Sequence, residues 1–212
     1  KRQLELRAYT SRLLGQSADL VLHGGGNTSV KDVADNVFGV ADEILHIKGS
    51  GHDLQTIGTV GFAPTRLKTL QQLASLPTLS DLDMMRELKC SQVDPKAPAP
   101  SVEAIMHALI PHKYVDHTHA DAVVAISNTQ GGEEKIRELY GEDILVLPYV
   151  MPGFILAKQV FEATRNVNWD ERSGIILLHH GVFTFHEDAR TSYENMIRIV
   201  TQAEEYIADN TA

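Results

Sequence analysis

The amino-acid sequence predicts an α/β fold in which helices cover a partly antiparallel sheet. Segments in which apolar residues alternate interleave, along the whole chain, with segments that keep helical spacing. Glycine turns also follow the β-prone runs of the first third, as expected of hairpins. The 212 residues, 43% of them hydrophobic, suffice for one sizeable core, so we expect a single domain over residues 1–212.

The first third predicts one helix and several short strands. Residues 2–15 carry apolar side chains at helical spacing. Residues 19–22 form an apolar run that we expect to be a strand, followed by a glycine turn at 24–26 and a second strand through Val30. The stretch "EILHIKGSG", residues 43–51, repeats this pattern of an alternating run that ends in a glycine turn.

Two helices and an irregular connector follow. Pro64 suits the first turn of a helix, and Ser80 is a good N-cap for the next one. The stretch "QVDPKAPAPS", residues 92–101, contains three prolines and predicts an irregular connector. The expected inner faces are Leu67, Leu70, Leu73 and Ala74 in the first helix, and Leu82, Met85 and Leu88 in the second.

The second half alternates helices and strands. We expect a helix from Ser101 to Pro111 and a long amphipathic helix from Asp188 onwards. Between them, the expected strands cover residues 114–119, 144–147 and 175–178, and the expected helices cover 132–140 and 154–165.

Composition narrows the possible functions. A formal charge of −9 argues against a nucleic-acid backbone as the main partner. No apolar run reaches the length that spans a bilayer and no leader-like segment begins the chain, so we expect a cytoplasmic protein. The first residue is Lys1 rather than Met, which is compatible with a domain taken from a longer chain. The single Cys90 excludes an internal disulfide and a cysteine cluster, so histidines and carboxylates would have to hold any metal.

Two histidines lie one residue apart in "HKYVDHTHADAVVAIS", residues 112–127. Side chains alternate along a strand, so His117 and His119 project to the same face. Two imidazoles on one face can belong to a zinc site, which in catalytic centres has three protein ligands. They can also be partly buried histidines bonded to Asp116 or Asp121, and the pair alone does not separate the two explanations.

A third imidazole is available where the apolar run 175–178 ends at His179, His180 and Gly181. Strand alternation sends the two histidines to opposite faces, so only one of them can join the first pair. The alternative explanation is a strand end that happens to be polar.

Glu103 is a candidate acid–base residue in "APAPSVEAIMHAL". Ser101 and Glu103 fall in the first turn of the predicted helix, where the backbone dipole favours a carboxylate. That preference is a sufficient structural explanation. The functional alternative is a general base beside a metal, which requires a carboxylate that is not one of the three fixed ligands.

Two glycine-containing turns offer anion-binding groups. The stretches "HGGGNTSVK", residues 23–31, and "KGSG", residues 48–51, combine backbone N–H groups with Asn and Ser side chains, which can cradle a phosphate. Taken singly, each is more typical of a simple hairpin turn. Neither fits a nucleotide-binding fingerprint, and no G-x-S-x-G supports a serine nucleophile.

Together these residues resemble the class II aldolase/adducin family, the zinc-dependent sugar-phosphate aldolases and their relatives. The amino-acid sequence around these motifs is most similar to the aldolase half of bifunctional rhamnulose-phosphate aldolase/short-chain dehydrogenase chains. No Y-x-x-x-K pair or dinucleotide fingerprint is present here. The family's motifs occur in order as G-N-x-S at 26–29, S-G at 50–51, P-S-x-E at 100–103, H-x-H at 117–119 and H-G at 180–181.

The resemblance implies a role for each motif. Glu103 would be the catalytic acid/base, and Tyr149, in "LPYVMPG", matches a tyrosine proton donor that reaches a neighbouring subunit. Val102 departs from the family pattern, which has a second serine there, so one hydroxyl contact to a phosphate is lost. The implied metal ligands are His117, His119 and His180, and the implied phosphate-binding residues are Asn27, Ser29, Ser50, Gly51 and Ser101.

The implied fold is a three-layer α/β/α sandwich with a mainly antiparallel sheet, assembled as a homotetramer with the site at a subunit interface. The implied reaction is the reversible cleavage of a rhamnulose- or fuculose-like ketose 1-phosphate to dihydroxyacetone phosphate and an aldehyde. Zinc or another divalent metal would act as a Lewis acid on the substrate oxygens.

Two other functions fit the same scaffold. A pentulose-phosphate 4-epimerase or a sugar-phosphate dehydratase uses the same three histidines, so the ligands do not separate them from an aldolase. A non-catalytic adducin-like interaction module would be expected to lose the zinc histidines or the acid, and all four residues are present here.

Overall fold

A seven-stranded sheet forms the centre of the computed structural model, which describes residues 2–210. The strands are β1 (Asn27–Asp35), β2 (Ala41–Lys48), β3 (Phe62–Arg66), β4 (Tyr114–Thr118), β5 (Ile144–Leu147), β6 (Gly174–Leu177) and β7 (Gly181–His186). Their spatial order is β3-β2-β1-β4-β7-β6-β5. All neighbouring strands pair antiparallel except β5 and β6, which are parallel.

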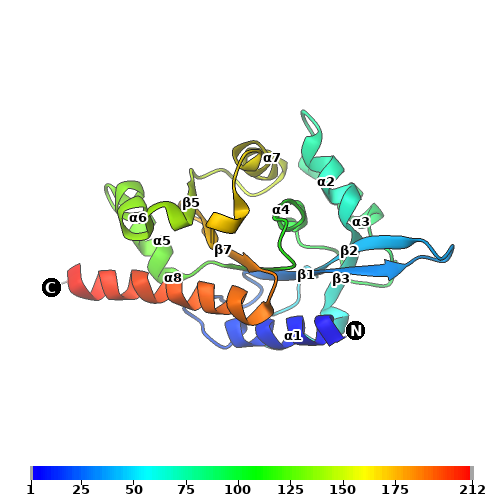
Figure 1. Cartoon of the computed structure of the whole chain (residues 1–212), viewed down its shortest axis with the longest axis horizontal. Coiled ribbons are helices and arrows are strands. Elements are labelled where there is room, and N and C mark those ends of the chain that lie inside the picture. The colour runs from blue at the N-terminus through cyan, green and yellow to red at the C-terminus, as the bar shows by residue number, and fades with distance from the viewer. Residues whose placement is uncertain (1, 211–212) are drawn as a thin grey trace.

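Helices cover both faces of this sheet (Figure 1). They are α1 (Arg2–Gly15), α2 (Leu67–Ser75), α3 (Asp81–Cys90), α4 (Ala104–Leu109), α5 (Asp121–Ser127), α6 (Gly132–Tyr140), α7 (Phe154–Thr164) and α8 (Ala189–Asn210). Apolar residues of α2, α3, α4 and α7 share one core, and those of α5, α6, α8 and the end of α1 share another on the opposite face. The predicted α/β class and the three-layer arrangement with a mainly antiparallel sheet are confirmed.

Strand alternation divides the apolar residues between these two cores. In β6, Ile175 and Leu177 pack into the core under α7, whereas Ile176 packs against α8. Each fully buried side chain of this size stabilises the fold by about 1.5–3 kcal/mol. A strand covered on both faces reads as a continuous apolar run, which is why "GIILL" shows no polar residue.

The apolar run at residues 19–22 is not the predicted strand. Leu20 and Val21 are buried, but their amides donate to the carbonyl of Ser17 and form a turn. The strand of this region, β1, begins only after the three glycines and continues to Asp35. The prediction failed because burial of a short apolar run is compatible with a turn that packs beneath α1.

Two details of the α2–α3 region also differ from prediction. Pro64 lies within β3 instead of starting a helix. β3 is the edge strand, and the Pro64 carbonyl accepts from Val93 on its outer side, so the missing N–H costs no ladder bond to β2. Ser80 caps α3 as predicted, its hydroxyl accepting an amide hydrogen bond within the first turn. The inner face of α3 is displaced, however, because Met84 and Leu88 are buried and Leu82 is 86% exposed.

In the second half, the predicted strands and helices lie within a few residues of their expected bounds. The helix expected from Ser101 is shorter, since α4 begins only at Ala104. Strand β7 and helix α5 were not predicted. β7 begins at Gly181, directly after the turn that follows β6 and contains His179 and His180. The prediction ended the strand at this turn and expected no further strand after it.

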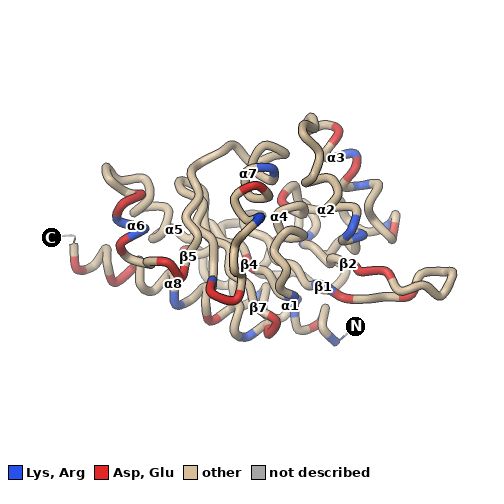
Figure 2. The backbone as a smooth tube through the Cα atoms, turned by 45° about the horizontal axis from the view of Figure 1, so that its top comes forward, with Lys and Arg blue, Asp and Glu red and all other residues tan. Residues whose placement is uncertain are grey.

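Charged residues are spread over most elements, and in the described part of the chain the basic residues form no continuous stripe along the tube (Figure 2). The projecting β1–β2 hairpin carries acidic residues on both strands (Figure 2). Within residues 2–210, none of the helices combines the length and the apolar character that crossing a membrane would require.

Candidate metal centre

Three histidines converge at the ends of neighbouring strands. His117 lies near the end of β4, His119 follows that strand directly, and His180 ends the turn between β6 and β7. One nitrogen from each imidazole lies within 4.8 Å of the others. Among residues 2–210, this is the single group of three or more His, Cys, Asp or Glu side chains with that spacing. The structure therefore brings together all three predicted metal ligands.

The glycine after His180 makes this convergence possible. A Cβ at Gly181 would lie 2.3 Å from the Thr118 carbonyl oxygen and 3.2 Å from the His117 ring, so a larger residue would push β7 away from β4. The His117 ring also stacks on Phe183 of β7, with ring centroids 4.0 Å apart. Close packing of β7 against β4 thus sets the place of the His117 ring.

A backbone turn, rather than strand alternation, directs the side chains of His179 and His180 to different sides. His179 has a left-handed backbone, with φ of 60°, and its ring hydrogen-bonds Asn128 away from the cluster. Only one of the two histidines joins the first pair, as predicted, but the backbone turn is the reason.

The hydrogen bond of His117 to the backbone leaves a lone pair on the ring nitrogen that faces the cluster. Nδ1 of His117 donates to the Val182 carbonyl, 2.9 Å away, which leaves its Nε2 facing Nε2 of His119 at 3.1 Å. Burial, together with neighbouring His119, holds the pKa of His117 well below 6.5. Burial also lowers the pKa of His180 to about 4, against the opposing effect of Glu103. Neutral imidazoles that converge in this way fit a divalent cation such as zinc.

Glu103 lies at the edge of the cluster. Its Oε2 is 3.4 Å from Nε2 of His117 and its Oε1 is 3.4 Å from Nε2 of His180. Glu103 is the residue immediately before α4, whereas the prediction had placed it in the first turn of that helix. Its side chain is almost fully buried, and Oε1 has no hydrogen-bond partner. A buried carboxylate oxygen without a partner is costly unless a proton, a ligand or an ion occupies its place in the working protein.

Two of the predicted polar residues adjoin this carboxylate. The Asn27 amide nitrogen donates to Glu103 Oε2 at 2.5 Å and to Ser101 Oγ at 3.2 Å. The loop that carries Ser50 and Gly51 runs beside the Ser101 segment, because the Ser50 amide donates to the Ala99 carbonyl at 2.7 Å. Both glycine-turn motifs therefore contact the segment that carries Ser101 and Glu103.

Ser29 and Tyr149 lie farther from Glu103. Ser29 is fully buried, and its hydroxyl is 2.8 Å from Nδ1 of His107. Tyr149 is 48% exposed, and its ring centroid is 6.2 Å from that of His179. The structure thus places one of them behind the carboxylate and the other at the surface.

Two residues of this region were not predicted. His107 follows Glu103 by four residues on α4 and bonds both Ser29 and Asn27, and its spacing from Glu103 was the only available signal. Lys48 is 4% exposed, and its ammonium donates to the Gly24 carbonyl at 3.1 Å. Nothing in the alternation of β2 distinguishes Lys48 from a surface lysine.

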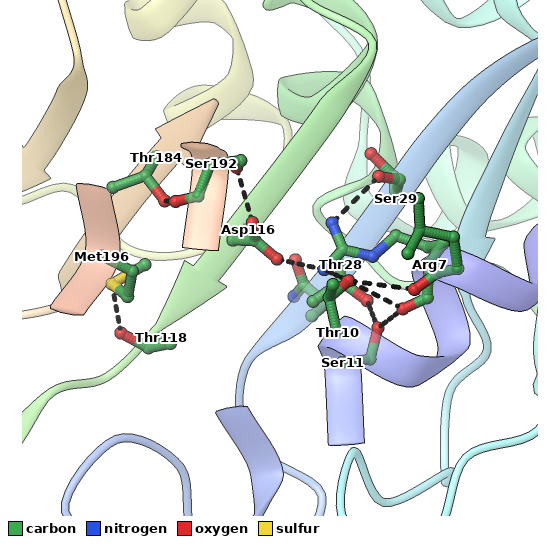
Figure 3. A network of polar contacts seen from close by, with 12 residues as sticks. Arg7, Thr10, Ser11, Thr28, Ser29, Asp116, Thr118, Thr184, Ser192 and Met196 are labelled. Carbon is green, nitrogen blue, oxygen red and sulfur yellow. Dashed lines mark hydrogen bonds and ion pairs between the residues drawn. The ribbon is translucent and has the colours of Figure 1, made fainter. Parts of the chain in front are cut away.

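A buried polar network contacts β4 through Asp116 (Figure 3). Arg7 of α1 donates to Asp116 at 2.5 Å, and Ser192 of α8 donates to the second carboxylate oxygen at 2.5 Å. Asp116 and His117 are adjacent in a strand and so point to opposite faces. The network therefore ties the ligand-bearing strand to two helices. Its other labelled members are Thr10, Ser11, Thr28, Ser29, Thr118, Thr184 and Met196.

Comparison with known proteins places this arrangement in a family. An uncharacterized oxidoreductase, YuxG, of Bacillus subtilis (strain 168) is 35% identical over 207 residues, which are 97% of this chain and 30% of that protein. The chain thus spans less than a third of that relative.

Solved structures agree with this relationship. The N-terminal class II aldolase domain of a conserved protein from Thermoplasma acidophilum is 40% identical, with a TM-score of 0.87 over 95% of this chain and 92% of that one. L-fuculose-1-phosphate aldolase from Thermus thermophilus shares the fold, with 17% identity and a TM-score of 0.61 over 98% and 95% of the two chains. The family model described as Class II Aldolase and Adducin N-terminal domain matches residues 5–207, and the chain belongs to this family.

Proposed function

We propose that this chain is a metal-dependent aldolase that reversibly cleaves a ketose 1-phosphate of the deoxysugar type to dihydroxyacetone phosphate and an aldehyde. His117, His119 and His180 would hold zinc or another divalent ion. The observation that carries the proposal is the unpartnered Oε1 of Glu103 beside three converging imidazoles. That combination pairs a metal centre with a buried carboxylate that is free to move a proton.

The residues divide the reaction between them. A divalent ion held by the three histidines supplies Lewis-acid stabilisation of negative charge on substrate oxygens. In cleavage, protonated Glu103 delivers its proton to the carbon of the dihydroxyacetone phosphate fragment that loses its C–C bond, and in synthesis the carboxylate removes a proton from that carbon. Asn27 holds Oε2 of Glu103, so Oε1 faces the reacting carbon. Burial of the carboxylate excludes water that would compete for this proton.

The buried Lys48 supports an anionic substrate. The Lys48 ammonium lies against the glycine loop through Gly24, and the Lys48 carbonyl accepts from the Ser101 amide. Burial lowers the pKa of Lys48, while the carboxylates of Asp53 and Glu103 oppose this shift and favour the charged form. An ammonium at the glycine loop, on a residue whose carbonyl bonds the Ser101 amide, would offer a phosphate both charge and a hydrogen bond. Lys48 thus compensates for the hydroxyl that is missing at Val102.

We also propose that Tyr149 acts in a neighbouring subunit of a homotetramer. It is half-exposed and lies on the His179 side of the centre rather than against Glu103. A surface tyrosine that approaches the site of another copy fits a proton donor to the aldehyde oxygen in the direction of synthesis, and it would accept the proton of the same substrate hydroxyl when the C–C bond breaks. A cytoplasmic location is compatible with the single Cys90.

The proposal is tested by incubating the zinc-loaded protein with a panel of ketose 1-phosphates and measuring dihydroxyacetone phosphate. We expect release from at least one deoxyketose 1-phosphate, and condensation in the reverse direction. If pentulose 5-phosphates instead interconvert at C4 without release of a triose phosphate, the epimerase alternative replaces the aldolase. No turnover of any sugar phosphate, together with no affinity for divalent metals, would refute an enzymatic function.

A further inference from the structure

His107 is a fully buried residue that supports the Glu103 carboxylate from behind. Its Nδ1 lies 2.8 Å from Ser29 Oγ, and its Nε2 lies 2.5 Å from Asn27 Oδ1. Solvent reaches none of the ring. Both ring nitrogens are therefore committed to protein partners, and the residue has no nitrogen left for a metal or a substrate.

The partners determine which nitrogen carries the proton. Proton transfer is assigned to Oε1 of Glu103, so Oε2 carries no hydrogen and only accepts, and the Asn27 group that faces Oε2 is therefore its amide nitrogen. The amide oxygen of Asn27 then faces Nε2 of His107, and because this oxygen also only accepts, Nε2 must carry a hydrogen. Nδ1 of the neutral ring accepts from the Ser29 hydroxyl. Burial keeps the pKa of His107 well below 6.5, which agrees with a neutral ring.

The surroundings leave His107 little freedom to change this arrangement. Its backbone amide donates to the Glu103 carbonyl at 3.2 Å, so both residues belong to the same helical turn. Its ring lies edge-on to Phe183, with centroids 5.5 Å apart. Ser29 is fixed in the centre of the sheet between β2 and β4. Three hydrogen bonds thus link Ser29 to His107, His107 to Asn27, and Asn27 to the Glu103 carboxylate.

We propose that His107 is a positioning residue whose Nε2–H tautomer fixes the Asn27 amide as a donor to Glu103 Oε2. Oε1 is then the only carboxylate oxygen that faces the substrate. If the amide turned over, its oxygen would meet the carboxylate and repel it, which would displace Oε1 from the reacting carbon. This inference rests on the proposed function only in taking Glu103 as the proton-transfer group.

Two substitutions separate this role from simple packing. In His107→Gln, the amide nitrogen occupies the region of Nε2 and can still donate to Asn27. In His107→Asn, the shorter amide lies near the place of Nδ1 and reaches Ser29 but not Asn27. With zinc bound, we expect the glutamine variant to keep kcat within about threefold of wild type, and the asparagine variant to lose about 100-fold, with KM little changed in both, because small displacements of a catalytic group cost about that much.

Tyr140→Phe is the matched control. The Tyr140 hydroxyl makes one buried hydrogen bond, to the Ile199 carbonyl at 2.7 Å, in the core on the other face of the sheet. Its loss costs about 1 kcal/mol of stability, as does the loss of one His107 bond, and is expected to leave kcat unchanged. Equal losses of kcat in the two His107 variants, or a loss in Tyr140→Phe as large as that in His107→Asn, would overturn the positioning role.

The tautomer itself is measured without any assay of activity. In protein labelled with ¹⁵N-histidine, long-range ¹H–¹⁵N correlation spectra distinguish the Nε2–H from the Nδ1–H form of each ring. We expect a neutral Nε2–H ring for His107 near neutral pH, and a charged ring or an Nδ1–H ring would overturn the inference. Because this spectrum requires no substrate, it decides the inference about His107, while the triose-phosphate assay decides the proposed function.

Discussion

Arg7 and Asp116 form a fully buried ion pair behind the metal centre. The two charged atoms are 2.5 Å apart and neither side chain reaches solvent. The pair connects the first helix to the strand that carries His117, and Ser192 of α8 completes the carboxylate's hydrogen bonds (Figure 3). The N-terminal helix is therefore part of the support of the site.

Removing the Arg7 charge should destabilise the whole fold. Breaking a buried pair leaves an uncompensated charge, so Arg7→Met is expected to lower the free energy of unfolding by about 3–5 kcal/mol. Arg86→Met, which breaks an exposed pair with Asp83, should cost about 0–1 kcal/mol. Urea denaturation of the metal-free variants measures both. Equal effects would show that the buried pair contributes no more than a surface one.

Metal affinity should depend on His119 and not on His179. His119→Ala removes one of three imidazole ligands, and we expect a loss of at least about 100-fold in zinc affinity, since even outer contacts of a ligand are worth about 10–100-fold. His179→Asn is the control, because asparagine tolerates the left-handed backbone at this position. Titration calorimetry with zinc compares them. Similar affinities in the two variants would remove His119 from the ligand set.

The metal-free protein should lose stability as the pH falls from about 6.5 to about 4. The pKa of His180 is about 4 in the folded protein, whereas an unfolded histidine has a pKa near 6.5. In this range the unfolded chain binds the proton and the folded chain does not, so acid favours unfolding. His117, whose pKa is also depressed by burial, adds to the slope. His180→Asn should flatten the curve, and an unchanged pH dependence would contradict the assigned ionisation.

Replacing Lys48 should weaken the binding of the phosphorylated end of the substrate. A charge-assisted hydrogen bond contributes about 1.5–3 kcal/mol, so Lys48→Met is expected to raise KM for a ketose 1-phosphate by about 10–100-fold. The KM for the same sugar without phosphate should not change. Lys158→Met, in an ion pair with Glu162 on α7, is the control. An equal rise in KM for both sugars would show that Lys48 supports the loop rather than the anion.

Much of the fold follows from periodicity in the sequence. The helices at the two ends and the three short strands of the second half were predicted because their apolar spacing is sustained and their bounds are marked by turn residues. Residues 19–22 misled the prediction because a short buried run looks alike in a strand and in a turn. Pro64 did so because its tolerance depends on an edge position that only the assembled sheet reveals.

The candidate site was predictable where motifs share a strand end or a turn. His117 and His119 are close in sequence, and Gly181 marks the close approach that brings His180 to them. His107 was missed because its partners Ser29 and Asn27 lie about eighty residues earlier in the chain. Contacts between side chains from distant segments depend on the register of β1 against β4, which no local pattern encodes.

The most direct test of the catalytic assignment is a paired measurement of zinc affinity and turnover in Glu103→Gln. Glutamine keeps the size of the side chain and can still bond Asn27, but it cannot transfer a proton. We predict zinc affinity within about threefold of wild type and a fall in turnover of about 10²–10⁴-fold on the best ketose 1-phosphate. Full activity in Glu103→Gln, or a loss of activity that merely follows a loss of zinc, would contradict the role of Glu103 as the proton-transfer group.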